Sequence, residues 1–141
     1  MKFTEEMFDY LFEHLGLEKK LKVKDKDWIE KTVDFTTPWE KIDYTQGVNQ
    51  ASGLDISKYG IDDADKLRAD IQAKGITFEG MENMGTTTLI DYLYKKVLRP
   101  KIVGPAFIYN YPVIMQPLAR VSDADEQIVE QFQLLVNGWE I

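Results

Sequence analysis

The last third of the chain has the clearest pattern of hydrophobic and polar positions, and this pattern predicts two strands. Residues 107–111 form a short aromatic and β-branched run bounded by Pro105 and Pro112. Residues 130–136 alternate with the period of two that is typical of a strand. The alternation places Phe132, Leu134 and Val136 on one face and Gln131, Gln133 and Leu135 on the other.

A two-residue hairpin turn is predicted at Asn137 and Gly138, because Asn and Gly best tolerate the positive φ that both turn positions require. A return strand must follow such a turn, yet the sequence stops shortly afterwards at Ile141. A first arm without a full partner would leave apolar residues and backbone groups uncovered. We therefore expect the 141 residues to be a fragment of a longer protein.

The register of this hairpin follows from its two-residue turn. Val136 should face Trp139, and Leu135 should face Glu140. Glu140 then shares a face of the sheet with Leu135 and, diagonally, with Gln133. The side chains of Gln133 and Glu140 can therefore converge on one ligand, whereas Trp139 is expected on the core-facing side.

Helical periodicity dominates the earlier part of the chain. Thr4 is the expected N-cap of a first helix that Gly16 ends. Residues 45–52 predict a short helix ended by Gly53, although Gly47 weakens it by about 1 kcal/mol relative to alanine. The apolar stripe of the first helix consists of Met7, Phe8, Leu11, Phe12 and Leu15.

Two further helices are predicted in the middle of the chain. Asp62 is expected to cap a helix over residues 63–74, with Gly75 as its stop. Another helix should begin at Thr86 or Thr87 and end before Pro100. In the first of these helices Leu67 and Ile71 are expected to be buried, and in the second Leu89, Leu93 and Val97 share one face.

A polar-faced hairpin is predicted between the first helix and this helical middle. Residues 19–24 and 28–35 both alternate, and residues 25–27 supply the turn between them. The lysines of the hairpin have two interpretations. They can contact a nucleic acid, or they can be the solvated face of a half-exposed strand, which is the commoner case.

Length and composition fit one small α+β domain over residues 1–141. With 44% hydrophobic residues there is enough apolar material for a core, and the absence of cysteine excludes disulfides and thiolate metal sites. A net charge of -7 opposes binding of nucleic acid by this chain alone. We see neither a membrane-spanning apolar run nor a signal segment, and we expect no membrane partner and a cytoplasmic protein.

Three possible chemical motifs are weak. The glycines of residues 80–87 have the spacing of a phosphate-binding loop, but Thr86 stands where the lysine should be. The acids Asp62, Asp63 and Asp65 can suggest a hard cation, yet acids at a helix start are favoured by capping and by the helix dipole. His14 is the sole histidine, so a site with two histidines is impossible.

Three stretches carry a resemblance to a known family. They are Phe-Ile-Tyr-Asn-Tyr-Pro at 107–112, Pro-Leu-Ala-Arg at 117–120, and Gln-Phe-Gln-Leu-Leu-Val-Asn-Gly-Trp-Glu-Ile at 131–141. In this order and at this spacing, they resemble the catalytic domain of class II lysyl-tRNA synthetases. The likeness is specific after about Gly104 and weaker upstream, through the stretches at 89–91, 37–39 and 1–6.

This resemblance implies an α+β fold with two parts. Residues 1–103 would be a helix-rich insertion with a hairpin, and residues 104–141 would be antiparallel strands of the catalytic sheet. The parent enzyme would join lysine to tRNA through a lysyl-adenylate made from ATP, with Mg²⁺ as cofactor, and would be a homodimer. We expect the fragment to be inactive by itself and to bind neither ATP nor Mg²⁺ tightly.

The resemblance also implies one metal site. The family positions that match Gln133 and Glu140 are typically both glutamates that hold magnesium beside the ATP phosphates. Glu140 matches this pattern, whereas Gln133 departs from it and offers a carbonyl oxygen without charge. We therefore expect Glu140 and, more weakly, Gln133 to be metal ligands. No catalytic or cofactor-binding residue is expected in this chain.

A different class of function stays open beside the ligase. A stand-alone, non-catalytic module derived from a synthetase would suit an acidic surface and an exposed strand edge, which favour a protein partner. In that case, Gln133 and Glu140 would simply be solvent-face residues.

Overall fold

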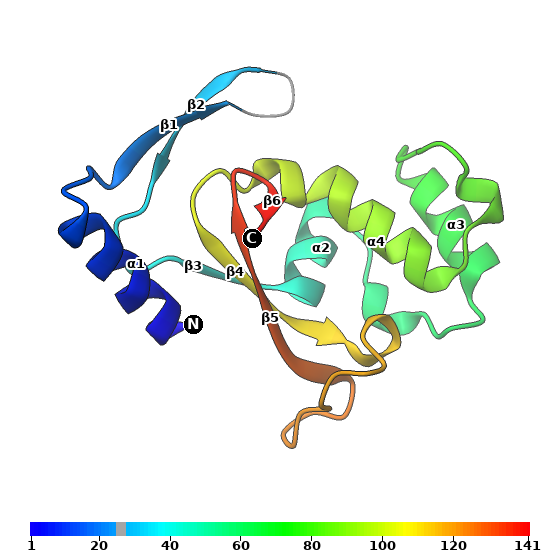
Figure 1. The fold of residues 1–141 in the computed structure, drawn as a ribbon. Helices are drawn as coiled ribbons and strands as arrows, with labels where there is room; N and C mark the ends of the chain where they lie inside the picture. Colours follow the sequence, from blue (N-terminus) through cyan, green and yellow to red (C-terminus); the bar gives the residue numbers. More distant parts are fainter. Residues whose placement is uncertain (25–27) are drawn as a thin grey trace.

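The sheet of this protein has four strands in the order β3-β4-β5-β6. The computed structural model describes residues 1–24 and 28–141, and it confirms an α+β fold (Figure 1). Strand β4 pairs antiparallel with β5, and β5 pairs antiparallel with β6. The bounds are Glu40–Asp43 for β3, Ala106–Pro112 for β4, Ile128–Val136 for β5 and Trp139–Glu140 for β6.

Strand β3 was not predicted, and it changes the character of the sheet. It runs parallel to β4, with Ile42 opposite Ile108, so the sheet is mixed rather than purely antiparallel. The strand has four residues, too few for an alternating pattern to be recognised. Its partner strand lies far along the chain, so no local turn indicates the pairing.

The four α-helices are α1 (Lys2–His14), α2 (Tyr44–Ser52), α3 (Ala64–Ala73) and α4 (Thr86–Val97). Short 3₁₀ turns, named η1 to η4, cover Ile56–Lys58, Met81–Asn83, Arg99–Lys101 and Val113–Met115. All four predicted helices are therefore confirmed in place. Across the described residues, none of the helices is both long and apolar enough to cross a bilayer.

Two predicted caps are wrong. Helix α1 starts before Thr4, with Met1 at the N-cap position and no side-chain cap. The partly buried Met1 side chain packs against the cluster that contains Phe12 and Trp39, and this packing extends the helix by a turn. At α3 the N-cap is Asp63 rather than Asp62, and its carboxylate accepts from the Gly60 backbone N–H instead of from the helix.

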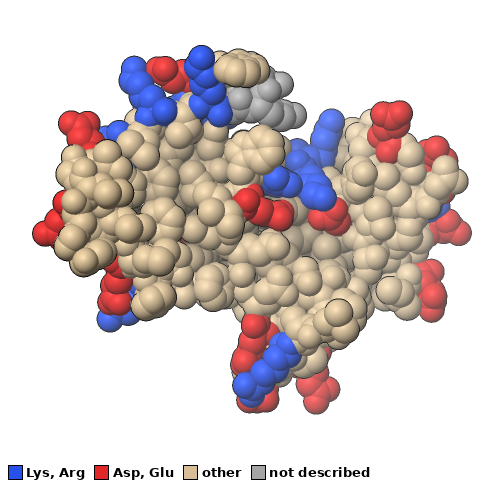
Figure 2. All heavy atoms as spheres, in the orientation of Figure 1, with Lys and Arg blue, Asp and Glu red and all other residues tan. Residues whose placement is uncertain are grey.

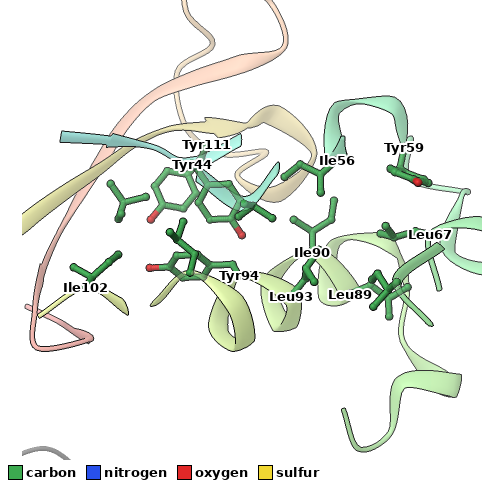
Figure 3. Close-up of a cluster of buried hydrophobic side chains, with 14 of the residues drawn as sticks. Tyr44, Ile56, Tyr59, Leu67, Leu89, Ile90, Leu93, Tyr94, Ile102 and Tyr111 are labelled. Atoms are coloured by element: carbon green, nitrogen blue, oxygen red, sulfur yellow. The ribbon is translucent and has the colours of Figure 1, made fainter. Parts of the chain in front are cut away.

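Helix α2 packs against β4, α4 packs against α2, and α3 packs against α4, so that the three helices enclose the larger core with one face of the sheet (Figures 1 and 3). Complete burial of an aliphatic or aromatic side chain contributes about 1.5–3 kcal/mol. Leu67 and Ile71 are buried as predicted, and on the shared face of α4 Leu89 and Leu93 are buried while Val97 is partly buried. The sheet contributes Ala106, Ile108, Tyr111, Val129 and Leu135 to the same core.

Gly47 explains how α2 can lie so close to the end of α4. A Cβ added at this glycine would come 2.8 Å from Leu98 Cδ2 and 3.0 Å from Ile42 Cγ2. The helix-weakening glycine therefore has a packing role, because it allows a close approach between the helix, the sheet and Leu98.

Helix α1 and a separate hairpin cover the other face of the sheet (Figure 1). The predicted hairpin is confirmed as β1 (Lys20–Lys24) and β2 (Glu30–Asp34), although its turn at 25–27 lies outside the described residues. The Glu5 carboxylate accepts from the Trp39 backbone N–H at 2.7 Å and ties α1 to the start of β3. This second core contains Phe12, Val33, Phe35, Trp39, Phe107, Leu134 and Val136.

The predicted apolar stripe of α1 is only partly buried. Phe12 is buried and Phe8 is partly buried, but Met7, Leu11 and Leu15 are exposed. Helix α1 meets the second core along a narrow edge, which covers fewer positions than the stripe contains.

Candidate functional site

The C-terminal hairpin has the predicted turn and register. Asn137 and Gly138 have φ values of 52° and 75°, as a two-residue turn of this kind requires. Val136 pairs with Trp139 and Leu135 pairs with Glu140. The hairpin is also held by a bond from the Ile141 N–H to the Leu134 carbonyl, at 3.0 Å.

Gln133 and Glu140 lie on the face of the sheet that α2 and α4 cover. Leu135 is opposite Glu140 on β6, and Gln133 lies two positions before Leu135 on β5, so all three share a face. The neighbouring Ile108 and Leu135 belong to the larger core. The structure thus places the two predicted site residues on the same face, as the register indicated.

The Gln133 side chain is held by a tyrosine. The Tyr111 hydroxyl donates to Gln133 Oε1 at 2.5 Å, and Tyr111 itself is 3% exposed. This bond fixes the amide orientation and uses one of the two lone pairs of Oε1. One lone pair is left for a second partner.

Glu140 lies beside an arginine that the sequence did not indicate. Arg99, on η3, places Nη1 at 3.8 Å from Glu140 Oε1, and its Nε donates to the Gly138 carbonyl at 2.5 Å. The Asn137 N–H also donates to the Val103 carbonyl at 3.0 Å. The segment after α4 therefore holds the turn that carries Glu140.

Three tyrosines pack together beside this face (Figure 3). The Tyr44 ring centroid is 5.0 Å from that of Tyr94 and 4.6 Å from that of Tyr111. Within the described part of the chain, the buried hydroxyls of Tyr44 and Tyr94 have no hydrogen-bond partner. Burial raises the pKa of Tyr94 to about 12, and the negative charge of Glu140 adds to this shift.

The expected burial of Trp139 is wrong. Its pairing with Val136 does place it on the face of the second core, but the side chain is 54% exposed. The period of a strand determines the face of a residue, not whether another element covers it. Helix α1 and the β1–β2 hairpin do not cover β6.

The three weak motifs make contacts within the protein, among them a bond from the Gly60 N–H to Asp63 and an ion pair between Asp65 and Arg68. Arg68 donates to the carbonyls of Met81 and Met84, and Thr86 is buried and donates to Ile61, so the loop at 80–87 is packed against protein. Among the described residues, no group of three or more His, Cys, Asp or Glu side chains is arranged to hold a metal ion. His14 stacks on Tyr10 on α1.

Two lysines of the β1–β2 hairpin are paired with acids of the same hairpin. Lys20 is 3.5 Å from Asp34, and Lys22 is 3.0 Å from Glu30. Lys24 lies over the Trp28 ring. These pairs favour the solvated-face interpretation over a contact with nucleic acid.

A cavity of about 550 Å³ lies at the other end of β4 and β5. At its wall, Asn110 Nδ2 donates to Asp43 Oδ2 at 2.8 Å, which links the β4 bulge to the first turn of α2. Asp43, Asp125 and Glu126 are among the lining residues, and no Lys or Arg is. Three acids without a basic side chain oppose a phosphate ligand, so this cavity is a poor nucleotide site.

Gln133 and Glu140 offer oxygen ligands of the kind that a hard cation such as Mg²⁺ takes, with one negative charge between them. Mg²⁺ commonly keeps several waters and takes one or two carboxylates together with substrate phosphates. Glu140 supplies one half-exposed carboxylate, and Gln133 supplies one oriented amide oxygen. The two residues therefore suit a metal shared with a phosphate ligand better than a closed protein cage.

The family model of class II tRNA synthetases (D, K and N) matches residues 1–141. The chain belongs to this family. It is 36% identical over 141 residues to the lysine–tRNA ligase of Wolinella succinogenes, and the match covers 100% of this chain and 26% of that protein.

Other relatives of this class II synthetase chain agree. The lysine–tRNA ligase of Aquifex aeolicus is 33% identical over 142 residues, which is 100% of this chain and 22% of that protein. Lysine–tRNA ligase 2 of Methanosarcina mazei is 30% identical over 112 residues, which is 79% of this chain and 21% of that protein. The chain thus spans about a quarter of the length of these curated relatives.

Proposed function

We propose that this chain is part of the catalytic domain of a lysine–tRNA ligase. The match of the whole chain to a part of proteins of that name supports the activity. The observation that carries the proposal is the placement of Gln133 and Glu140 on one face beside a turn held by Arg99 of η3 and by Val103. The whole protein would act on lysine, ATP and tRNA, and its role in protein synthesis would place it in the cytoplasm.

In this proposal, Glu140 and Gln133 would hold Mg²⁺ against the phosphates of the nucleotide. The metal would neutralise phosphate charge that redistributes during adenylate formation. Glu140 contributes the anionic ligand, while Tyr111 keeps the Gln133 carbonyl oxygen oriented. The remaining groups that bind the nucleotide and select lysine would come from the rest of the protein.

The proposal is tested with Glu140→Gln in the whole protein. Lysine-dependent exchange of pyrophosphate into ATP should fall, and the magnesium concentration for half-maximal rate should rise, because a charged ligand is lost. Circular dichroism checks that the fold is intact. An unchanged rate and an unchanged magnesium midpoint would show that Glu140 is only a surface residue of the strand.

A protein-binding module without catalysis is the second candidate. The exposed Phe3 and Tyr10 side chains on α1 favour it, because exposed apolar groups often mark contacts with other proteins. The same exchange assay separates the two functions. A whole wild-type protein that folds but shows no lysine-dependent exchange would support the module.

A further inference from the structure

Arg99 places a positive charge beside Glu140. Its Nε donates a hydrogen bond to the Gly138 carbonyl, while Nη1 lies 3.8 Å from Glu140 Oε1. The Arg99 side chain is 23% exposed and that of Glu140 is 44% exposed. Figure 2 shows basic and acidic side chains next to each other in this region, where β6 meets the end of α4.

The negative charge of Glu140 is therefore partly neutralised by the positive charge of Arg99. Gln133 is neutral, so Glu140 is the anion of the predicted pair, and Arg99 forms an ion pair with it. A divalent cation bound at Glu140 would be repelled by the guanidinium. The single carboxylate is thus partly neutralised before any metal binds.

We propose that Arg99 is a built-in counter-ion of Glu140 that sets how tightly this face binds a divalent cation. The inference rests on the metal role of Glu140 in the proposed function. The new element is that Arg99, on the 3₁₀ turn η3 after α4, controls the charge of the site. Arg99 is a positioning and charge-tuning residue here and not a catalytic one.

The charge of Arg99 can be separated from its hydrogen bond. The turn keeps two backbone bonds that do not involve the Arg99 side chain, from Asn137 to Val103 and from Ile141 to Leu134. The Glu140 position should therefore persist when Arg99 is replaced. Arg99→Gln removes the charge and keeps an amide that can donate to Gly138, while Arg99→Lys keeps the charge.

The experiment measures Mn²⁺ binding to this chain by water-proton relaxation. Removal of a unit charge a few ångströms from a divalent ion, with screening by salt, should tighten binding on the order of tenfold. Arg99→Gln should show this gain, and Arg99→Lys should stay within about twofold of the wild type. Lys101→Gln is the matched control, because it removes an exposed lysine of the same 3₁₀ turn.

The tighter Mn²⁺ binding of Arg99→Gln must depend on the Glu140 carboxylate. In the Arg99→Gln background, Glu140→Gln should abolish the tighter Mn²⁺ binding. The proposal is overturned if Arg99→Gln and wild type bind Mn²⁺ equally, including the case in which neither binds, or if Lys101→Gln gives the same gain.

This result is independent of the enzyme assay. Tighter Mn²⁺ binding by Arg99→Gln with no lysine-dependent exchange in the whole protein would support the counter-ion and reject the ligase. Exchange in the whole protein without an effect of Arg99→Gln on Mn²⁺ binding would support the ligase and reject the counter-ion.

Discussion

The Tyr111 hydroxyl donates a hydrogen bond of 2.5 Å to the Gln133 side-chain oxygen, and this bond joins β4 to β5 on the face that carries Glu140. Tyr111 is almost fully buried, so water cannot readily replace the bond. The relationship connects the hydrophobic core with the candidate metal site, because the same tyrosine packs against Tyr44.

Tyr111→Phe should lower the free energy of unfolding by about 1 kcal/mol. The ring still packs, but the Gln133 oxygen loses its donor in a partly buried position. Urea denaturation of this chain, followed by far-ultraviolet circular dichroism, measures the difference. No loss of stability would mean that water substitutes for the hydroxyl.

Tyr94→Phe is the comparison for Tyr111→Phe. The Tyr94 hydroxyl is buried and has no partner among the described residues, so removing it should be neutral or should stabilise the protein by up to about 1 kcal/mol. A clear destabilisation in urea would show that this hydroxyl makes a bond to an ordered water.

High pH should destabilise the folded chain through the same tyrosines. Burial raises the Tyr94 pKa from 10.0 to about 12 in the folded state, so the unfolded state loses its proton first. Stability is complete below pH 10 and should fall as the pH rises towards 12. Urea midpoints at pH 8, 9, 10 and 11 test this, and Tyr94→Phe should show a shallower decline.

Glu5→Ala should be among the more destabilising changes on α1. The Glu5 carboxylate is 8% exposed and accepts from the Trp39 N–H, and an unpaired buried donor costs about 1–3 kcal/mol. Glu6→Ala is the matched control, since Glu6 is exposed and pairs with Lys2 along the helix. Equal urea midpoints for the two variants would contradict a role for Glu5 in tying α1 to the sheet.

The sequence predicted those features that local chemistry determines. The turn at Asn137 and Gly138 determines the pairing of Leu135 with Glu140, and the structure has this register. Helix ends marked by Gly53 and Gly75 were found for the same reason, since both glycines adopt positive φ after a helix.

Features that depend on distant contacts were not predictable. Arg99 and Gly138 are 39 positions apart, and their contact exists only because the segment after α4 returns to the hairpin. The parallel strand β3 depends on a partner far along the chain in the same way. The exposure of Trp139 was missed because alternation cannot indicate what lies above a strand.

Gln133→Glu should restore a second carboxylate at the candidate metal site. The added charge lies on the same face as Glu140 and should tighten Mn²⁺ binding by this chain, measured by water-proton relaxation. The Tyr111 hydroxyl would then donate to a charged acceptor, which strengthens that bond. The gain should be larger at pH 8 than at pH 5, because a proton shared by two neighbouring carboxylates competes with the metal. If the affinity is the same at both pH values and equal to that of the wild type, positions 133 and 140 do not hold one cation together.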